Sequence, residues 1–417
     1  MTKEELKELK NELGIEYDKY KSMNLSLDMS RGKPGTDQLD ISLGVLMTVE
    51  PEDYISETGF DYRNYGILDG IPECKKLFAD LLQVDAENII VCGNSSLNLM
   101  FDYLTQCYYK GVCGNKPWKE QGKVKFICPV PGYDRHFSIA EFLGIEMIPV
   151  MTNSEGPDMD AIRELVKDPM VKGAFCVPKY SNPTGIIYSD RVVKEFAELK
   201  PAADDFRVIW DNAYCIHDLV DSPKQLANIF DYALKNGTEK LFVEFTSTSK
   251  ISFPGAGVSC IAASTYNVKD ILGRMKYQTI GFDKLNQLRH IKYFKDVNGI
   301  REHMKKHASI IRPKFDIVLE ALENEIKPIE IGKWIKPEGG YFISYDVTVG
   351  SAKRIGELCK DLGLVLTSVG ATYPYGNDPD DKNIRIAPTY PSQDDLRMAV
   401  KIFCLCAKIA AIESLLK

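Results

Sequence analysis

Four side chains carry the reactive groups that stand out in this sequence: Asn182, Asp211, Tyr214 and Lys250. Each follows a short apolar run of the kind that forms a buried strand. The lysine can form an imine, and the carboxylate can keep a ring nitrogen protonated. The phenol and the amide can hydrogen-bond to a ring oxygen. Pyridoxal 5′-phosphate, the electron sink of amino-acid chemistry, needs all of these groups, so the set predicts an enzyme that uses this cofactor.

Lys250 follows the apolar run 241–245 and ends the sequence Ser247-Thr-Ser-Lys250. A lysine at the end of a strand is more often a solvated surface charge than a catalytic group. Here small hydroxyl residues flank it, and Pro254-Gly-Ala-Gly257 turns the chain back into another strand. A short loop between two buried strands can keep an amine away from water, which makes it neutral and nucleophilic.

Asp211 ends the run Val208-Ile-Trp210, and Tyr214 follows three residues later. This spacing can place both side chains on one side of a turn, where the phenol would adjust the pKa of an adjacent imine. A cap on the following helix explains the aspartate equally well. Asn182, within Ser181-Asn-Pro-Thr-Gly185, has only ordinary turn chemistry around it.

The segment Gly93-Asn-Ser95-Ser96 joins a predicted strand to a helix that begins near Leu97. Backbone N–H groups and hydroxyls at a helix N-terminus form a ready phosphate site. A plain helix cap accounts for the same residues, and the sequence leaves both interpretations open.

The elements that position these residues are predicted by seven β-branched apolar runs that alternate with helical segments: 89–92, 124–128, 145–150, 174–177, 208–210, 241–245 and 258–262. Near-continuous apolar runs are typical of strands covered by helices on both faces, with right-handed crossovers between parallel pairs. Elsewhere the pattern predicts a short helix over 3–14, a loop over 28–35, long helices over 268–325, strands over 341–347 and 383–387, and a closing helix over 392–417.

We therefore expect an α/β fold with two domains. The large one, residues 51–309, would have three layers around a mostly parallel seven-stranded sheet and would bind the cofactor. The smaller α+β domain would be built from both chain ends, 1–50 and 310–417. The chain has 417 residues, which is long enough for two or three domains.

Composition narrows the class of protein. The net charge of −7 argues against a nucleic-acid-binding surface. The eleven cysteines form no Cys-x-x-Cys pair, so free thiols in a reducing compartment explain them better than zinc or disulfides. The N-terminus lacks the apolar core of a signal peptide, and no apolar run approaches the ~20 residues of a membrane span. We expect a cytoplasmic protein with no metal, nucleic-acid or membrane partner.

Taken in order, the motifs resemble those of a known family. They are Tyr65-x4-Gly70-Ile-Pro-Glu, Pro131-Gly-Tyr133-Asp-Arg-His136, Asn182-Pro-Thr-Gly, Asp211-x-x-Tyr214, Ser247-x-x-Lys250 and Arg385. This series is similar to that of the fold-type I aminotransferases of class I, over roughly residues 25–395. The amino-acid sequences of segments 29–34, 93–97 and 384–388 look most like those of the bacterial aspartate aminotransferase subgroup called Ic.

The resemblance implies a role for each matching residue. Lys250 would hold the cofactor as an imine and move the proton of the substrate α-carbon. Asp211 would pair with the pyridine nitrogen, and His136 would support it from behind. Tyr214 and Asn182 would contact the ring 3-oxygen.

Further residues would hold the phosphate and the substrate. Tyr133 would stack on the ring, and three hydroxyls would bind the phosphate: Ser95, Ser96 and Ser247. Tyr65 would reach that phosphate from the partner subunit of a homodimer with composite active sites. Arg385 would clamp the substrate α-carboxylate, a task that suits its two-pronged guanidinium. Asn182 and Gly32 would complete the substrate site.

One position departs from the family pattern. Class I enzymes usually carry a phosphate-binding arginine eight residues after the lysine, and this chain has Val258 there. The phosphate must therefore be balanced by hydroxyls, by backbone N–H groups or by a cation from elsewhere in the chain.

The implied activity is transamination, with aspartate or glutamate as amino donor and 2-oxoglutarate or oxaloacetate as acceptor. A different amino-acid scope (aromatic, 2-aminoadipate or alanine) and a carbon–sulfur lyase remain alternatives, and a sensor domain of a regulator is a third. The sequence does not single out a receptor for a side-chain carboxylate among four candidates: Arg31, Lys33, Arg63 and Arg135.

Three other patterns in the sequence partly match sites of different protein classes. Ser247-x-x-Lys250 also fits penicillin-recognising enzymes, but their Ser-Asp-Asn and Lys-Thr-Gly triplets are missing. His303 and His307 lie one helical turn apart without the glutamate of a zinc protease, so exposed helix histidines are expected instead of a metal site. Gly255-Ala-Gly257 lacks the third glycine of a dinucleotide loop.

Overall fold

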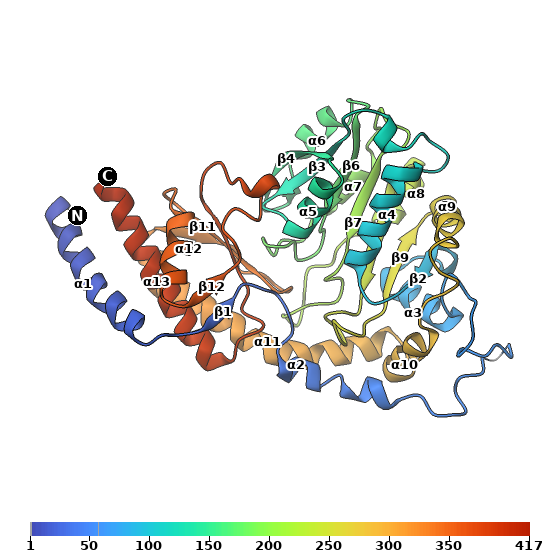
Figure 1. Cartoon of the computed structure of the whole chain (residues 1–417), viewed down its shortest axis with the longest axis horizontal. Helices are drawn as coiled ribbons and strands as arrows, with labels where there is room; N and C mark the ends of the chain where they lie inside the picture. The colour runs from blue at the N-terminus through green and yellow to red at the C-terminus, as the bar shows by residue number, and fades with distance from the viewer. Residues whose placement is uncertain (1, 57) are drawn as a thin grey trace.

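The computed structural model describes residues 2–56 and 58–417. Figure 1 shows two lobes, with the long helix α11 (Val297–Glu325) running beneath both. The larger lobe contains an eight-stranded sheet in the order β2-β9-β8-β7-β6-β3-β4-β5. Its strands are β2 Ile89–Val91, β3 Lys125–Val130, β4 Glu146–Asn153, β5 Gly156–Pro157, β6 Val171–Cys176, β7 Arg207–Asp211, β8 Phe242–Ser247 and β9 Ser259–Ala263.

All seven predicted strands are present in this sheet, and the centre of the sheet is parallel. Strands β4, β3, β6, β7 and β8 pair in parallel, whereas β9 and β2 pair antiparallel at one edge. The eighth strand, β5, was not predicted because two residues are too short to leave an apolar run. It pairs antiparallel with the end of β4.

Helices cover both faces of the sheet, which explains why its strands are apolar throughout. In β7, Ile209 packs with the helices α4 and α5, and Trp210 packs on the opposite face with α7 and α8. Parallel strands buried on both faces require apolar residues at every position. The helices of this lobe are α3 Pro72–Leu82, α4 Ser96–Lys110, α5 Asp134–Phe142, α6 Met159–Leu165, α7 Asp190–Ala197, α8 Ile229–Asn236, α9 Thr265–Met275 and α10 Lys284–Phe294.

The smaller lobe combines elements from both ends of the chain. A parallel pair, β1-β12, and an antiparallel sheet, β10-β11-β13, pack against the C-terminal helix. Its elements are α1 Lys3–Ser22, β1 Leu27–Met29, α2 Thr36–Asp40, β10 Gly332–Trp334, β11 Ile343–Val347, α12 Ala352–Asp361, β12 Leu364–Leu366, β13 Asn383–Ile386 and α13 Gln393–Leu416.

Two elements of this lobe differ from the prediction. Helix α1 extends to Ser22 instead of ending near residue 14, because Tyr17 and Tyr20 pack against the core although they do not continue the leucine spacing. Strand β1 lies at the edge of a segment predicted as a loop, and its partner β12 is far away in the sequence. Within the described residues, no helix is both long and apolar enough to cross a membrane.

Candidate active site

The four residues that opened the sequence analysis meet at the carboxyl edge of the large sheet. Asn182 lies beyond β6, Asp211 ends β7, and Lys250 lies in the loop after β8. Lys250 Nζ lies 4.8 Å from the centre of the Tyr214 ring. Ligands of open α/β sheets bind at this edge, because the parallel strands all end there.

The surroundings of Lys250 shift its amine towards the neutral form. Burial lowers its pKa from the ordinary value, and the charge of Asp211 opposes this shift in part. A second ring, that of Tyr341, lies 5.9 Å from Nζ. Among the described residues Lys250 makes no ion pair, so its nitrogen is available for covalent chemistry.

Asp211 is buried, and its two carboxylate oxygens have different surroundings. Oδ2 accepts a hydrogen bond from His136 Nε2 at 2.9 Å. The His136 ring stacks on Phe175 with their centres 4.7 Å apart, which fixes the imidazole in place. Oδ1 is buried and has no hydrogen-bond partner among the described residues. A buried carboxylate oxygen without a donor is costly, so this one requires a partner that a ligand would supply.

Tyr214 and Tyr133 line the same space. Burial raises the pKa of both phenols, so they are hydrogen-bond donors at neutral pH. Tyr133 lies directly before α5, and its ring meets the His136 ring edge-on at 5.0 Å. The sequence placed Tyr133 on the face of the cofactor ring, and the structure positions it beside the histidine that supports Asp211.

Arg385 is buried on β13, and its guanidinium has several partners. Nη1 pairs with Asp134 at 2.7 Å and donates to Asn182 Oδ1 at 3.1 Å, and Nε donates to Thr367 at 3.2 Å. With an exposed fraction of 6%, Arg385 is not a solvated surface charge. Arg385 thus faces the same space as Asn182.

Gly32 also lies against this part of the molecule. A Cβ atom at this position would come within 2.4 Å of the Phe342 ring, and that ring lies under the guanidinium of Arg385. The absence of a side chain at Gly32 therefore lets the N-terminal segment approach the substrate arginine closely.

The predicted phosphate residues form a polar loop cluster beside the N-terminus of α4. Ser95 caps that helix by accepting a hydrogen bond from the N–H of Leu97, and Ser96 is its first residue. Ser247 donates to Ser249, which in turn donates to the carbonyl of Asn94. The cap interpretation is therefore correct for Ser95, and a phosphate role is compatible with it.

Two further positions bear on the phosphate prediction. Tyr65 is 78% exposed. Val258 is buried among apolar residues, and its N–H donates to Thr248, which lies between Ser247 and Ser249. The Val258 side chain therefore offers no donor to a phosphate.

The prediction of exposed histidines at 303 and 307 was wrong. Both are buried, and both Nε2 atoms lie 2.9 Å from the carbonyl oxygen of Ile251, directly after Lys250. The Gln38 amide donates to His307 Nδ1, which leaves His307 Nε2 as the donor to Ile251. No cluster of three or more metal-ligating side chains occurs in the described ranges.

Sequence reasoning missed Asp134, Ser249 and Thr367. Asp134 and Ser249 lie inside the quoted motifs but were not singled out. Thr367 lies outside every quoted motif and carries no local signal. Of the four candidate receptors for a side-chain carboxylate, Arg63 pairs with Asp61, and Lys33 lies over the Tyr390 ring. Arg31 and Arg135 are exposed.

The assembled residues fit pyridoxal 5′-phosphate. A protonated ring nitrogen would supply the donor that Asp211 Oδ1 lacks. The amine of Lys250, with its lowered pKa, suits an imine. The hydroxyls and N–H groups at the start of α4 suit a phosphate.

Comparisons with known proteins identify the family of this chain. The chain matches the family model for aspartate amino-transferase over residues 1–417. An aspartate aminotransferase from Corynebacterium glutamicum is 45% identical over 398 residues, covering 95% of this chain and 92% of that protein. The crystal structure of an aspartate transaminase from the same species has a TM-score of 0.96 at 44% identity, covering 99% of this chain and 98% of that one.

A more distant structure shows the fold alone. The α-aminoadipate aminotransferase from Thermus thermophilus, solved with N-(5′-phosphopyridoxyl)-L-leucine, has a TM-score of 0.73 at 17% identity, covering 94% of this chain and 93% of that one. The resemblance stated from the sequence is confirmed, as is the α/β aminotransferase fold. The chain belongs to the aspartate aminotransferase family, whose members are pyridoxal-phosphate enzymes.

Proposed function

We propose that this protein transfers the amino group of aspartate or glutamate to 2-oxoglutarate or oxaloacetate. The observation that carries the proposal is the unpaired oxygen of Asp211 close to a lysine with a lowered pKa, in a chain of this family. The relative from C. glutamicum named for aspartate supports the choice of substrate.

The bound cofactor would supply an electron sink for the pair left when the substrate Cα–H bond breaks. Lys250 Nζ is the base that takes this proton, because its lowered pKa leaves the amine able to accept one. Tyr214, which lies next to Nζ, positions the amine. Together with Asn182 it would donate to the ring oxygen of the bound cofactor, and Tyr133 would cover the ring face and exclude water.

Asp211 holds a proton at the pyridine nitrogen. His136 donates to Oδ2 and so holds the carboxylate in place, which leaves Oδ1 free to accept from a ring nitrogen of the bound cofactor. A carboxylate held in this way keeps the ring positively charged, and this charge stabilises the electrons released from the substrate.

Arg385 binds the α-carboxylate, which every amino-acid and keto-acid substrate carries. Its present partners, Asp134 and Asn182, orient the guanidinium before substrate arrives. Gly32 leaves room for the N-terminal segment to close over this position. The phosphate is held by three hydroxyls: Ser95, Ser96 and Ser247.

The same proposal includes the assembly, the domains and the compartment. Tyr65, which is exposed here, would bind the phosphate of a second copy in a homodimer. The large domain would comprise residues 51–309, and the small one residues 1–50 and 310–417. Eleven free cysteines, nine of them buried, suit the reducing cytoplasm.

Two measurements on the purified protein test this function. Borohydride reduction of the yellow holoenzyme should fix a pyridoxyl group on the peptide that contains Lys250. An assay with paired amino and keto acids should show the highest kcat/KM for aspartate or glutamate. A label on another lysine would reject the site, and a preference for aromatic or aliphatic amino acids would reject the substrate assignment.

A further inference from the structure

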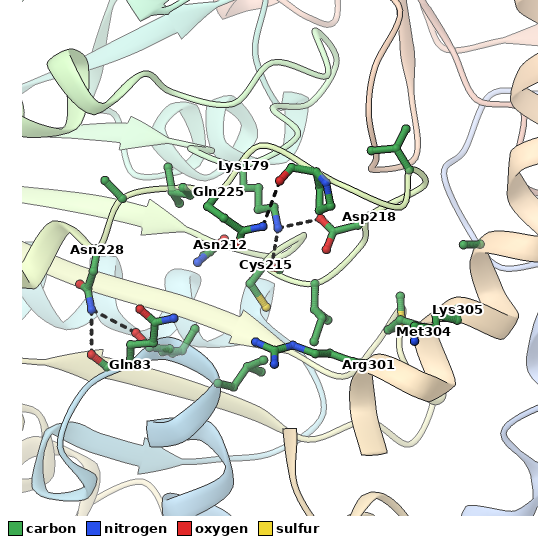
Figure 2. A pocket seen from close by; sticks show the side chains of 18 of the residues that line it. Gln83, Lys179, Asn212, Cys215, Asp218, Gln225, Asn228, Arg301, Met304 and Lys305 are labelled. Carbon is green, nitrogen blue, oxygen red and sulfur yellow. Dashed lines mark hydrogen bonds and ion pairs between the residues drawn. The ribbon is translucent and has the colours of Figure 1, made fainter. Parts of the chain in front are cut away.

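A second cavity, separate from the cofactor residues, lies on the other side of the ends of β7 and β8. Its volume is about 840 Å³, which is within the range of small-molecule sites. The C-terminus of α3, the segment before α8 and one face of α11 enclose it. Figure 2 shows Arg301 extending from α11 into the space between Gln83 and Cys215.

The floor of the cavity contains hydrogen-bond acceptors that lack donors. Glu244 is 4% exposed, and among the described residues its only hydrogen bond comes from Asn212 Nδ2 at 2.7 Å. Burial without a neighbouring cation raises the pKa of Glu244 to about 7. The Oδ1 atom of Asn212, itself 7% exposed, has no partner in the described part of the chain. Both groups would be satisfied by a cationic N–H donor.

The rim of the cavity, in contrast, carries a positive charge that lacks an anionic partner. Arg301 donates only to Asn298 at 3.3 Å and makes no ion pair among the described residues. Arg312, further along the same helix, donates to the carbonyl of Leu219 and pairs with Asp221. The lysine inside the cavity, Lys179, is already committed to Asp218 and to the carbonyl of Cys215, as the dashed lines in Figure 2 show. The unpaired positive charge therefore lies at α11, across from the unpaired acceptors on the floor.

We propose that this cavity binds a small zwitterion, an amino acid whose ammonium group meets Glu244 and Asn212 and whose carboxylate meets Arg301. An ammonium group supplies the donors that the floor lacks. A carboxylate supplies the partner that Arg301 lacks. This ligand would bind at a different site from the substrate, because the reacting amino acid binds at Arg385 on the other side of the strand ends.

The floor is rigid, so it can hold a ligand without much ordering. The Asn212 N–H donates to the carbonyl of Phe245 at 2.8 Å, and Thr246 donates to the Asn212 carbonyl at 2.9 Å. Asn212 and Cys215 directly follow Asp211 and Tyr214, so the same backbone positions both sites. Preorganised groups lose little entropy when they bind.

The test is calorimetric titration of the holoenzyme with ω-amino acids, which have no α-amino group to react: 3-aminopropanoate, 4-aminobutanoate and 6-aminohexanoate. At least one should bind with a Kd below about 10 mM. Glu244→Gln keeps the size of the side chain and the hydrogen bond from Asn212, and it should raise this Kd at least ~10-fold. Arg301→Gln, at an exposed position, should do the same without any risk to folding.

Two control variants separate this site from the active site. Arg385→Lys should leave the Kd unchanged, and so should Arg163→Gln on the distant outer face. The proposal is rejected if no ω-amino acid binds, or if Kd is the same in wild type, Glu244→Gln and Arg301→Gln. A Kd that rises only in Arg385→Lys would place the ligand in the active site and would equally reject it, while leaving the proposed transamination intact.

Discussion

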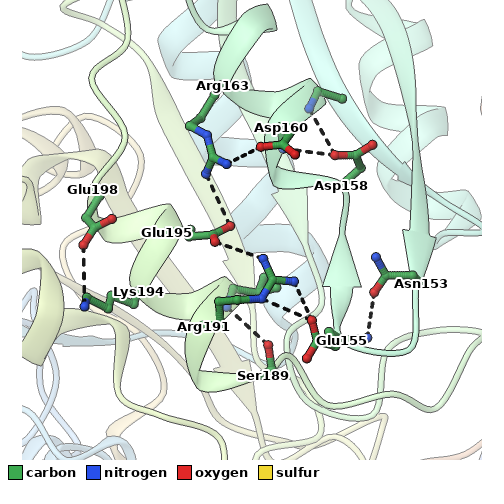
Figure 3. A network of polar contacts seen from close by, with 12 residues as sticks. Asn153, Glu155, Asp158, Asp160, Arg163, Ser189, Arg191, Lys194, Glu195 and Glu198 are labelled. Atoms are coloured by element: carbon green, nitrogen blue, oxygen red, sulfur yellow. Dashed lines mark hydrogen bonds and ion pairs between the residues drawn. The ribbon is translucent and has the colours of Figure 1, made fainter.

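Charged residues on the outer face of α6 and α7 are arranged very differently from those at the active site. On that face, Arg163 pairs with Asp160 and Glu195, and Arg191 pairs with Glu195 and Glu155 (Figure 3). The two arginine side chains are about half exposed, at 45% and 55%. Each of these charges has an ion-pair partner within the chain, and water reaches most of the network, although Glu195 Oε2 is buried and accepts no hydrogen bond among the described residues.

At the active-site edge the charges are buried and incomplete. Asp211 has one oxygen without a partner, and Lys250 has no ion pair in the described residues. An unsatisfied buried polar group costs on the order of 1–3 kcal/mol, whereas an exposed ion pair contributes about 0–1 kcal/mol. The comparison teaches that incomplete buried charges mark where a ligand completes the structure, while complete surface networks need none.

The largest effect is expected at Lys250. Lys250→Ala removes the base at the substrate α-carbon and should lower kcat for aspartate with 2-oxoglutarate at least ~10³-fold. The thermal unfolding midpoint of the apoprotein should stay close to wild type, because a half-buried amine without an ion pair contributes little to folding. Turnover within tenfold of wild type would show that Lys250 is not the base.

The second-largest loss of kcat is expected for Asp211→Asn. The amide keeps the shape of the carboxylate but cannot hold the ring nitrogen protonated, so kcat should fall at least ~10²-fold. Cofactor binding, followed by visible absorbance, should persist. Near-normal turnover would show that Asp211 has only a structural role at the end of β7.

Arg385→Lys should give a smaller loss, since lysine keeps the charge but not the two-pronged geometry. We expect kcat/KM to fall roughly 10- to 100-fold, by the same factor for aspartate and for alanine, with a normal cofactor spectrum. A loss confined to aspartate would contradict the assignment and move Arg385 to the side-chain carboxylate.

The sequence predicted elements and motif residues better than it predicted the partners of those residues. Lys250 and Asp211 follow apolar strands, so their place at the sheet edge was foreseeable. The pairing of Asp134 with Arg385 was not, because it joins α5 to β13 across 251 positions. His303 and His307 were misjudged for the same reason: a charged helix sequence does not reveal that the loop after Lys250 lies on it. Strand β1 depends on β12 in the same way.

Mixing two variants tests whether the active site needs a second chain. Tyr65→Phe alone should lower kcat/KM only about 3- to 10-fold, as expected for one lost phosphate hydrogen bond. Heterodimers of Tyr65→Phe with Lys250→Ala should regain one intact site, because both lesions fall in the same composite site. If Tyr65 serves its own chain, every site in the heterodimer is damaged, and mixing restores nothing.

The smallest effects are expected in the surface network. Arg163→Gln removes a charge that is 45% exposed, and Glu195→Gln removes one that is 19% exposed. Both lie on the outer face of α6 and α7, so kcat should not change. A double-mutant cycle on the free energy of unfolding should give a coupling of about 0.2–1 kcal/mol, because water and salt screen the pair. Adding 0.5 M salt should reduce that coupling, whereas the loss in Asp211→Asn should persist, since the Debye length at this ionic strength is only about 4–5 Å and buried pairs are screened little. A coupling well above 1 kcal/mol, or a change in kcat, would mean that the outer network supports the active site, and the contrast between the two regions would fail.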